Sequence, residues 1–290
     1  MKRFLQILGF VLIVAGVLFA VRAAADTPEK QGGFTMKWKR TLMDQSRTGT
    51  SMATADNVAE ALGTIDGTDY VAPNGKRFLG NTVTAKVAGA LIAAQGPMAR
   101  VKEVIGFAPE GMVREAPECA LYDLYIDQLM ASVEKSSGKK VDFALANRGG
   151  VRIDLPKGDI LLDDILSMFP FKNYTVYLQL TGKDIRRVLE QCAATPGFQI
   201  IGGARVRIKD GKLVSAEIGG KPLNDKQLYG VATISFLLNG GDNIFMARNA
   251  KAIEMYEVKM SDFMVDYFRE QKAAGLPIVY KADGRVTVEE

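Results

Sequence analysis

Histidine is missing from this 290-residue chain, and cysteine is scarce, with Cys119 and Cys192 alone. The absence of imidazole excludes every mechanism that uses it as base, nucleophile partner or metal ligand, including the Ser-His-Asp triad and most zinc or binuclear hydrolase centres. Two cysteines are too few for a cysteine-only zinc site or a disulfide scaffold. Because both lie on apolar helix faces, we expect buried free thiols, with a disulfide as the alternative in an oxidising compartment.

An excess of one charge is also lacking once the N-terminus is set aside. The formal net charge is +4, from 37 basic and 33 acidic residues. Three of the basic residues and none of the acidic ones lie in residues 1–25, which leaves 34 against 33 in the remainder. A nearly neutral chain has no electrostatic basis for nucleic-acid binding, and 48% hydrophobic residues are typical of a globular protein.

The first 25 residues have the pattern of an export signal. Lys2 and Arg3 precede an apolar run over residues 4–21, and Ala23-Ala24-Ala25 offers small residues for cleavage. We therefore predict an exported, periplasmic protein. The alternative is an uncleaved membrane anchor over residues 4–21, because about 18 residues can span a bilayer core.

The remaining chain divides by its patterning. Residues 26–33 predict a polar spacer, and residues 34–100 an α/β extension of unknown role. Residues 101–290 predict a domain of interleaved helices, strands and hairpins, which favours an α+β (mixed α/β) class over a doubly wound parallel sheet. The elements expected there are helices over 118–133 and 182–192, a helix capped by Ser261, strands over 141–146, 174–180, 229–234 and 285–288, and a hairpin over 205–218 through Asp210-Gly211. Strict alternation over 174–180 predicts a half-buried strand, and Thr181 with Asp184 predicts a helix cap.

Three local clusters have residue types suited to ligand binding. Residues 147–152 (Asn-Arg-Gly-Gly-Val-Arg) join a glycine turn to an arginine, which suits an anion. Residues 169–173 (Phe-Pro-Phe-Lys-Asn) and 234–242 (ending Asn-Gly-Gly-Asp) place aromatic rings on loops, where rings can stack on a planar base. Taken alone, the first string is also typical of an ordinary turn. Phe171 and Phe236, taken singly, are also typical of residues in a buried core.

The order of these strings is more specific than any one of them. Asn-x-Gly-Gly-Val-Arg, Pro-Phe-x-Asn, Thr-Gly-Lys at 181–183, and Phe followed by Gly-Gly-Asp resemble the C-terminal substrate-binding domain of the bacterial 5'-nucleotidase and UDP-sugar hydrolase family. The resemblance covers residues 101–290 and implies a layered fold of mixed sheets flanked by helices.

The resemblance also implies roles for particular residues. Phe171 and Phe236 would sandwich the nucleobase, Asn173 would hydrogen-bond it, and Asp242 would hold the ribose hydroxyls. The implied phosphate contacts are Arg152 and Arg114. Substrate-binding positions also include Asn147, and Gly197 against the nucleoside. Asn243 replaces a usual family glycine, and asparagine tolerates the left-handed conformation expected there.

In this family, a separate N-terminal metallophosphatase domain carries out hydrolysis with two metal ions and histidine ligands. No histidine is present, so we predict no catalytic residue, metal site or cofactor in this chain, and divalent metals in a partner chain. The leading hypothesis is the nucleotide-recognising component of a split periplasmic 5'-nucleotidase, inactive alone, that acts with a separate metallophosphatase polypeptide. The alternative is a stand-alone nucleotide or nucleoside binding protein.

Overall fold

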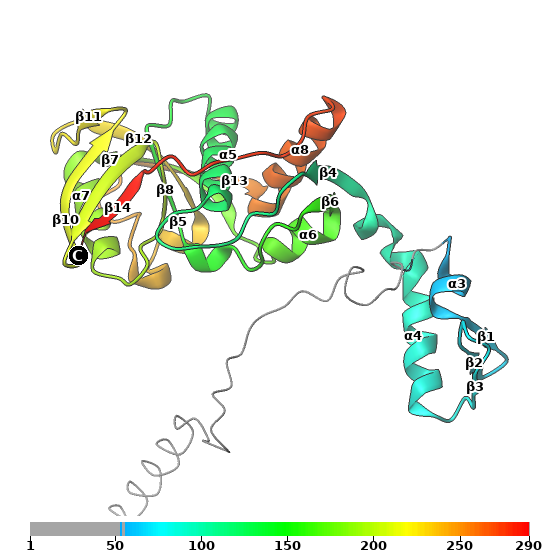
Figure 1. Ribbon diagram of the computed structural model, residues 1–290. Coiled ribbons are helices and arrows are strands. Elements are labelled where there is room, and N and C mark those ends of the chain that lie inside the picture. Colours follow the sequence, from blue (N-terminus) through cyan, green and yellow to red (C-terminus); the bar gives the residue numbers. More distant parts are fainter. Residues whose placement is uncertain (1–52, 54–55, 290) are drawn as a thin grey trace, which may run out of the picture. The chain divides into compact units, whose positions relative to one another are not determined.

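The computed structural model describes residues 53 and 56–289 (Figure 1). The predicted export signal, the spacer, and most of residues 34–55 lie outside the described residues. Within the described part of the chain, no helix has both the length and the apolar character needed to cross a bilayer.

Residues 56–102 contain helices and a small sheet. The elements are α3 (Val58–Leu62), β1 (Thr64–Asp66), β2 (Asp69–Val71), β3 (Arg77–Phe78), α4 (Val83–Met98) and η1 (Ala99–Lys102). The three strands form an antiparallel sheet, with a turn at Pro73-Asn74-Gly75 between β2 and β3. The apolar side chains of Val87 and Leu91 on α4 are exposed.

Residues 104–289 carry the large hydrophobic core. The helices are α5 (Ala120–Ser137), α6 (Leu162–Met168), α7 (Gly182–Ala193) and α8 (Met260–Ala273), with short turns η2 (Arg148–Gly150), η3 (Ser235–Leu237) and η4 (Gly241–Asn243). The strands are β4 (Val104–Ala108), β5 (Phe143–Ala146), β6 (Gly158–Leu161), β7 (Tyr174–Thr181), β8 (Ile200–Gly202), β9 (Ala204–Lys209), β10 (Lys212–Ile218), β11 (Lys221–Pro222), β12 (Leu228–Ile234), β13 (Ala252–Lys259) and β14 (Val286–Glu289).

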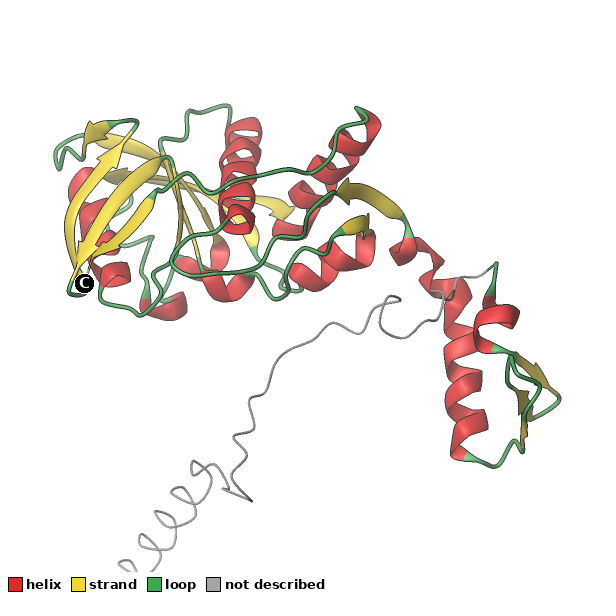
Figure 2. Ribbon diagram, in the orientation of Figure 1, coloured by secondary structure: helices red, strands yellow, loops and turns green. Residues whose placement is uncertain are grey.

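Two mixed sheets organise this region, which confirms the α+β class (Figure 2). The five-stranded sheet has the order β13-β7-β12-β5-β8, in which β5 and β12 are parallel and the other pairs antiparallel. The four-stranded sheet has the order β11-β10-β9-β14, in which β14 runs parallel to β9. Helix α7 contacts both β7 and β10 and so connects the two sheets, while α5 lies against the five-stranded sheet beside α8.

Several local predictions are confirmed. The 205–218 hairpin forms as β9 and β10, and the Thr181 hydroxyl accepts the Asp184 N–H at 3.2 Å to cap α7. Cys119 and Cys192 are buried and unpaired, and burial raises the pKa of the Cys192 thiol to about 12.

Two local predictions are wrong. Strand β7 is not half-buried: Thr175 and Tyr177 are buried as well as the apolar residues that alternate with them, because β7 lies inside the sheet between β12 and β13 and both α5 and α7 pack against it. Ser261 does not cap the last helix, which already begins at Met260. The cap comes from Asp262, whose carboxylate accepts the Lys259 N–H at 3.0 Å.

Candidate functional site

The strand directions bring the three predicted clusters to one edge of the five-stranded sheet. Asn147 follows the end of β5, and Phe236 follows the end of β12, which is parallel to β5. Asn173 directly precedes β7, which is antiparallel to β12 and therefore starts at the edge where β12 ends. Segments far apart in the sequence thus meet outside the carboxyl ends of two parallel strands, a common place for ligand sites in sheets with parallel strands.

A pocket of about 270 Å³ lies at this edge. Its lining residues are Asn147, Gly149, Arg152, Phe171, Asn173, Phe236 and Asp242. Six of the eight predicted substrate-binding residues therefore share one cavity. Arg114 and Gly197 do not line it.

The two phenylalanines of the pocket are exposed to it rather than packed in the core. Phe171 is 43% exposed and Phe236 is 41% exposed, whereas Phe169, two residues from Phe171, is buried with its ring centroid 5.0 Å from that of Tyr125. The alternative that Phe171 and Phe236 are core residues is therefore wrong. Two large apolar rings held at the mouth of a pocket can bind a planar, apolar surface by stacking.

Arg152 is held beside Phe171. Its guanidinium lies 5.7 Å from the Phe171 ring centroid, a cation–π distance, and its Nη1 donates to the Gly149 carbonyl at 3.1 Å. Within residues 53 and 56–289, Arg152 forms no ion pair with a carboxylate. Its positive charge therefore stays available to an anion in the pocket.

Asn147 presents an unused acceptor at the same place. The side chain is buried, and its Oδ1 atom has no hydrogen-bond partner among the described residues. A Cβ atom on Gly150 would lie only 2.9 Å from this oxygen, so glycine there leaves the amide its space. Neither Gly149 nor Gly150 has a positive φ, so Gly150 is needed here for space and not for backbone freedom.

The loop after β12 carries Phe236 and Asp242 in a tight turn. Asp242 and Asn243 have φ of 50° and 60°, which confirms the left-handed conformation expected at Asn243. A Cβ on Gly241 would lie 2.2 Å from the Phe236 carbonyl oxygen, so this position requires glycine.

Helix α7 fixes the far end of this loop, a connection that the sequence did not indicate. Asn249 Nδ2 donates to Asp184 Oδ1 at 2.9 Å, and Arg187 Nη2 donates to the Phe245 carbonyl at 3.4 Å. Burial tends to raise the pKa of Asp184, but hydrogen bonds from Thr181 and Asn249 outweigh it and hold the pKa below its usual value. Asp184, in the first turn of α7, thus also anchors the loop.

The two predicted residues outside the pocket have other partners. Arg114 forms an ion pair with Asp154, Nε to Oδ1 at 2.7 Å, and its Nη1 donates to the Val151 carbonyl at 3.0 Å. Gly197, with φ of 80°, accepts a hydrogen bond from Arg148 Nη1 on its carbonyl at 3.2 Å. Gly197 thus contacts Arg148, the residue that follows Asn147 in the chain, and not the pocket itself.

Three carboxylates elsewhere lie close enough to share a cation: those of Glu118, Asp123 and Asp283. Their oxygens already have partners. Glu118 accepts backbone N–H groups of Gly284 at 2.7 Å and of Val286 at 2.8 Å, and Arg285 Nε lies 3.4 Å from Asp123 and 3.1 Å from Asp283. This cluster is a structural ion network rather than a set of open metal ligands.

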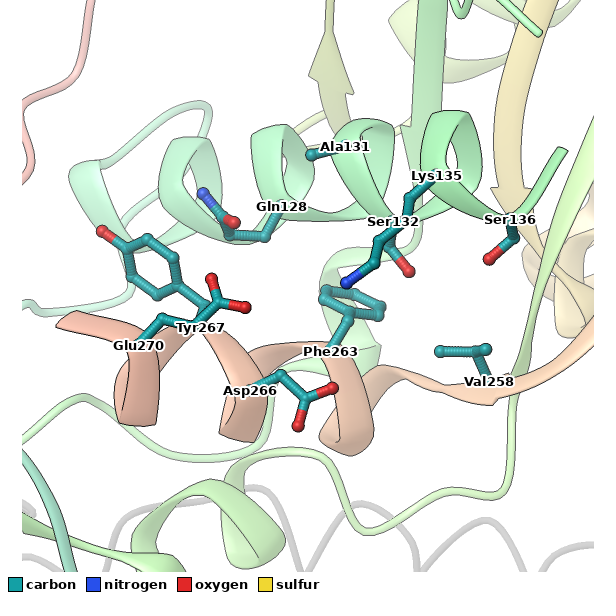
Figure 3. Close-up of a pocket in the computed structure, with 10 residues that line it drawn as sticks. All are labelled: Gln128, Ala131, Ser132, Lys135, Ser136, Val258, Phe263, Asp266, Tyr267 and Glu270. Carbon is teal, nitrogen blue, oxygen red and sulfur yellow. The ribbon is translucent and has the colours of Figure 1, made fainter. Parts of the chain in front are cut away.

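A groove of about 350 Å³ lies between α5 and α8 (Figure 3). Gln128, Ser132 and Lys135 of α5 face Phe263, Asp266 and Tyr267 of α8 across it. None of the predicted site residues lines this groove.

Comparisons with known proteins agree with this geometry. The sequence pattern of the family described as "5'-nucleotidase, C-terminal domain" matches residues 97–249. A 5'-nucleotidase-related protein of Glossina morsitans morsitans is 28% identical over 219 residues, which cover 65% of this chain and 39% of that protein. A 5'-nucleotidase of Vibrio cholerae is 35% identical over 107 residues, which cover 36% of this chain and 19% of that protein. The crystal structure of a 5'-nucleotidase precursor from Thermus thermophilus superposes with a TM-score of 0.61 at 26% identity, covering 70% of this chain and 43% of that one.

The chain belongs to the 5'-nucleotidase C-terminal domain family, because the family pattern covers more than half of its residues. The chain spans about two fifths of the length of the Glossina relative and a fifth of the Vibrio relative.

Proposed function

We propose that this protein is the nucleotide-recognising component of a split, exported 5'-nucleotidase, in which a separate metallophosphatase chain carries out hydrolysis. The observation that carries the proposal is the pocket itself: two exposed phenylalanine rings, an arginine that has no carboxylate partner among the described residues, an aspartate and two asparagines line one cavity. Similarity to 5'-nucleotidases over this region supports a nucleotide as its ligand.

Each part of a nucleotide has a matching group in the pocket. Phe171 and Phe236 supply apolar ring faces for a base, and the Asn173 amide can both donate to and accept from base edges. The Asp242 carboxylate can accept hydrogen bonds from two ribose hydroxyls, and the Arg152 guanidinium can donate hydrogen bonds to a phosphate. Asn147 Oδ1 adds an acceptor that has no partner within residues 53 and 56–289.

The chain itself lacks the groups for phosphoester hydrolysis as this family performs it. Two-metal hydrolysis needs a ligand cage for both ions, and the sequence contains no histidine. A partner that carries the metals would receive a substrate already oriented by the pocket, and such positioning lowers barriers by several kcal/mol. The export pattern of residues 1–25 supports an activity outside the cytoplasm.

Binding is tested by calorimetry of the full chain with AMP, UMP and adenosine. We expect saturable binding of at least one of them, with a purine preferred over a pyrimidine because its stacking surface is larger. Phe107→Ala is the matched control for Phe236→Ala, since Phe107 is also an exposed phenylalanine but lies on β4, outside the pocket. No heat with any of the three at millimolar concentration would contradict the pocket assignment.

The split-enzyme part is tested by phosphate release from AMP in the presence of Mn²⁺, Co²⁺ or Zn²⁺. We expect no turnover by the chain alone and turnover when a metallophosphatase chain lacking its own C-terminal domain is added. Binding without restored turnover favours the stand-alone binding protein. Metal-dependent phosphate release by the chain alone, abolished by Arg152→Ala, would refute the split arrangement.

A further inference from the structure

Strand β13 is a long edge strand of the five-stranded sheet. It stands at one end of the strand order, with β7 as its only strand neighbour among the described residues. Two other sheet edges are short: β8 has three residues, and β11 has two and ends in Pro222. Short strands and proline are usual ways of blocking edge-to-edge pairing, whereas β13 is eight residues long and has no proline.

The exposed face of β13 carries two apolar residues between two opposite charges. Ile253 is 50% exposed and Met255 is 60% exposed, and the exposed residues Lys251 and Glu257 lie on the same side of the strand. Lys251 and Glu257 make no ion pair within the part of the chain that the structure describes. The other side of the strand already has partners, because Glu254 is bound by Lys139 and accepts the Tyr256 hydroxyl at 2.7 Å.

We infer that a second copy of this chain pairs with β13, antiparallel and centred on Glu254. In this register Lys251 lies opposite Glu257 of the second copy, and Ile253 lies opposite Met255. The two-fold symmetry forms each pair twice. Opposite charges therefore face each other, and apolar side chains face apolar side chains. A shift of one residue would place Lys251 opposite Val258 and Glu257 opposite Ala252, which loses both pairs of opposite charges. Glu254 lies opposite Glu254 of the second copy at the two-fold axis, where the ion pair with Lys139 in each copy offsets its charge.

The regular part of the strand fits this arrangement. Residues 252–256 pair continuously with β7, and the register shifts only between Tyr256 and Lys259. The pairs 252–256, 253–255 and 254–254 of the proposed contact lie within this regular stretch. The result is a continuous ten-stranded sheet across two copies, with both pockets outside the new contact because their residues follow β5 and β12 or precede β7.

Charge reversal tests the pairing. The mass of the full chain is measured by sedimentation in a mild non-ionic detergent, which keeps the apolar N-terminal residues in solution. We expect twice the 31.5 kDa of one chain. Lys251→Glu or Glu257→Lys alone places like charges opposite each other twice and should weaken dimerisation about tenfold, while the double variant restores it. Val214→Glu is the control, since Val214 is exposed on β10, away from β13.

A second measurement locates the contact. Glu254→Cys brings two thiols together at the two-fold axis and should form an intermolecular disulfide on mild oxidation, while Val214→Cys should not. The native cysteines do not interfere, because both are buried. A monomeric wild-type chain, a dimer indifferent to the charge reversals, or cross-linking no faster at position 254 than at 214 would each overturn the inference.

Discussion

Two arginine-centred clusters in this protein differ in how many of their hydrogen-bonding groups are used. Arg285 is 6% exposed and contacts three carboxylates: Asp127 at 2.9 Å, Asp283 at 3.1 Å and Asp123 at 3.4 Å. It also donates to the Ile201 carbonyl at 3.3 Å. Burial alone would lower the pKa of Arg285, but its hydrogen bonds to Asp127 and Asp283 raise it.

Arg152 presents the opposite situation. Within the described chain it contacts one carbonyl, that of Gly149, and one ring face, that of Phe171. Beside it, Asn147 Oδ1 is buried without a partner among the same residues. The comparison separates structural polar clusters, whose groups are saturated, from binding polar clusters, whose groups keep capacity for a ligand. Substitutions in each of the two clusters test this difference.

The largest effect is expected from Arg285→Met. This change leaves Asp123 and Asp127 without their countercharge, and removing one partner of a buried ion network costs about 3–5 kcal/mol. Urea unfolding at pH 7.5 measures the loss, with Arg207→Met as control because Arg207 is an exposed arginine paired with Glu289. Equal losses in both variants would contradict the structural role of Arg285.

The pH dependence of stability should reveal Asp123. Burial raises the pKa of Asp123 to about 7. The positive charge of Arg285 acts in the opposite direction, and the negative charge of Glu118 adds to the rise. An unfolded aspartate loses its proton near pH 4, so between about pH 4 and 7 the folded state binds more protons and stability falls as the pH rises. From pH 5 to 7 the decline from this group is at most about 3 kcal/mol.

Asp123→Asn is the matched variant for this measurement, because its amide cannot ionise. Urea unfolding at pH 5, 6 and 7 should give a wild-type stability that falls relative to the variant. Parallel pH profiles for the two proteins would show that Asp123 is ionised throughout. Asp127, Asp283 and Arg285 face Asp123 in both proteins, so their own titration largely cancels in the comparison.

In the pocket, Phe236→Ala should weaken nucleotide binding by about 1–3 kcal/mol, the range for one base–aromatic stack. The ring is 41% exposed, so the free energy of unfolding should change little. Calorimetry with the best of the three nucleotide probes measures the affinity. A variant that lost stability but kept its nucleotide affinity would show that the Phe236 ring has a structural role and does not bind the base.

Gly197→Ala should have the smallest effect. A Cβ there would lie 1.9 Å from Arg148 Nη1, and φ of 80° disfavours alanine, so we expect a stability loss of about 1–2 kcal/mol. Nucleotide affinity should fall less than in Phe236→Ala, because Gly197 does not line the pocket. An affinity loss without any stability loss would instead mean that Gly197 touches the ligand.

The sequence predicted what depends on neighbours in the chain. The hairpin through Asp210-Gly211 and the Thr181 cap are confirmed, because a turn or a cap is decided within a few residues. The pocket residues could be proposed because four short motifs occur in family order. The parallel pairing of β5 with β12 brings these residues together. No short stretch of the sequence indicates that pairing.

Long-range contacts explain the rest. Alternation over 174–180 predicted β7 as a strand but not its burial, which comes from β12 and β13 on its two sides and from the helices α5 and α7 packed against it. Asp184 was predicted as a cap, while its second partner, Asn249, is 65 residues away. Arg285 stands in an ordinary Asp-Gly-Arg string, and nothing in that string points to acids on a helix 158 residues earlier.

The distance between Arg285 and α5 also sets an order of events during synthesis. Asp127 leaves the ribosome 158 residues before Arg285. At about 5–20 residues per second, the nascent chain waits roughly 8 to 30 s with these helix acids lacking their countercharge. The ion network on α5 is therefore completed only when Arg285, directly before β14, has been added, and ribosome-bound chains that stop short of residue 285 should remain sensitive to protease at α5.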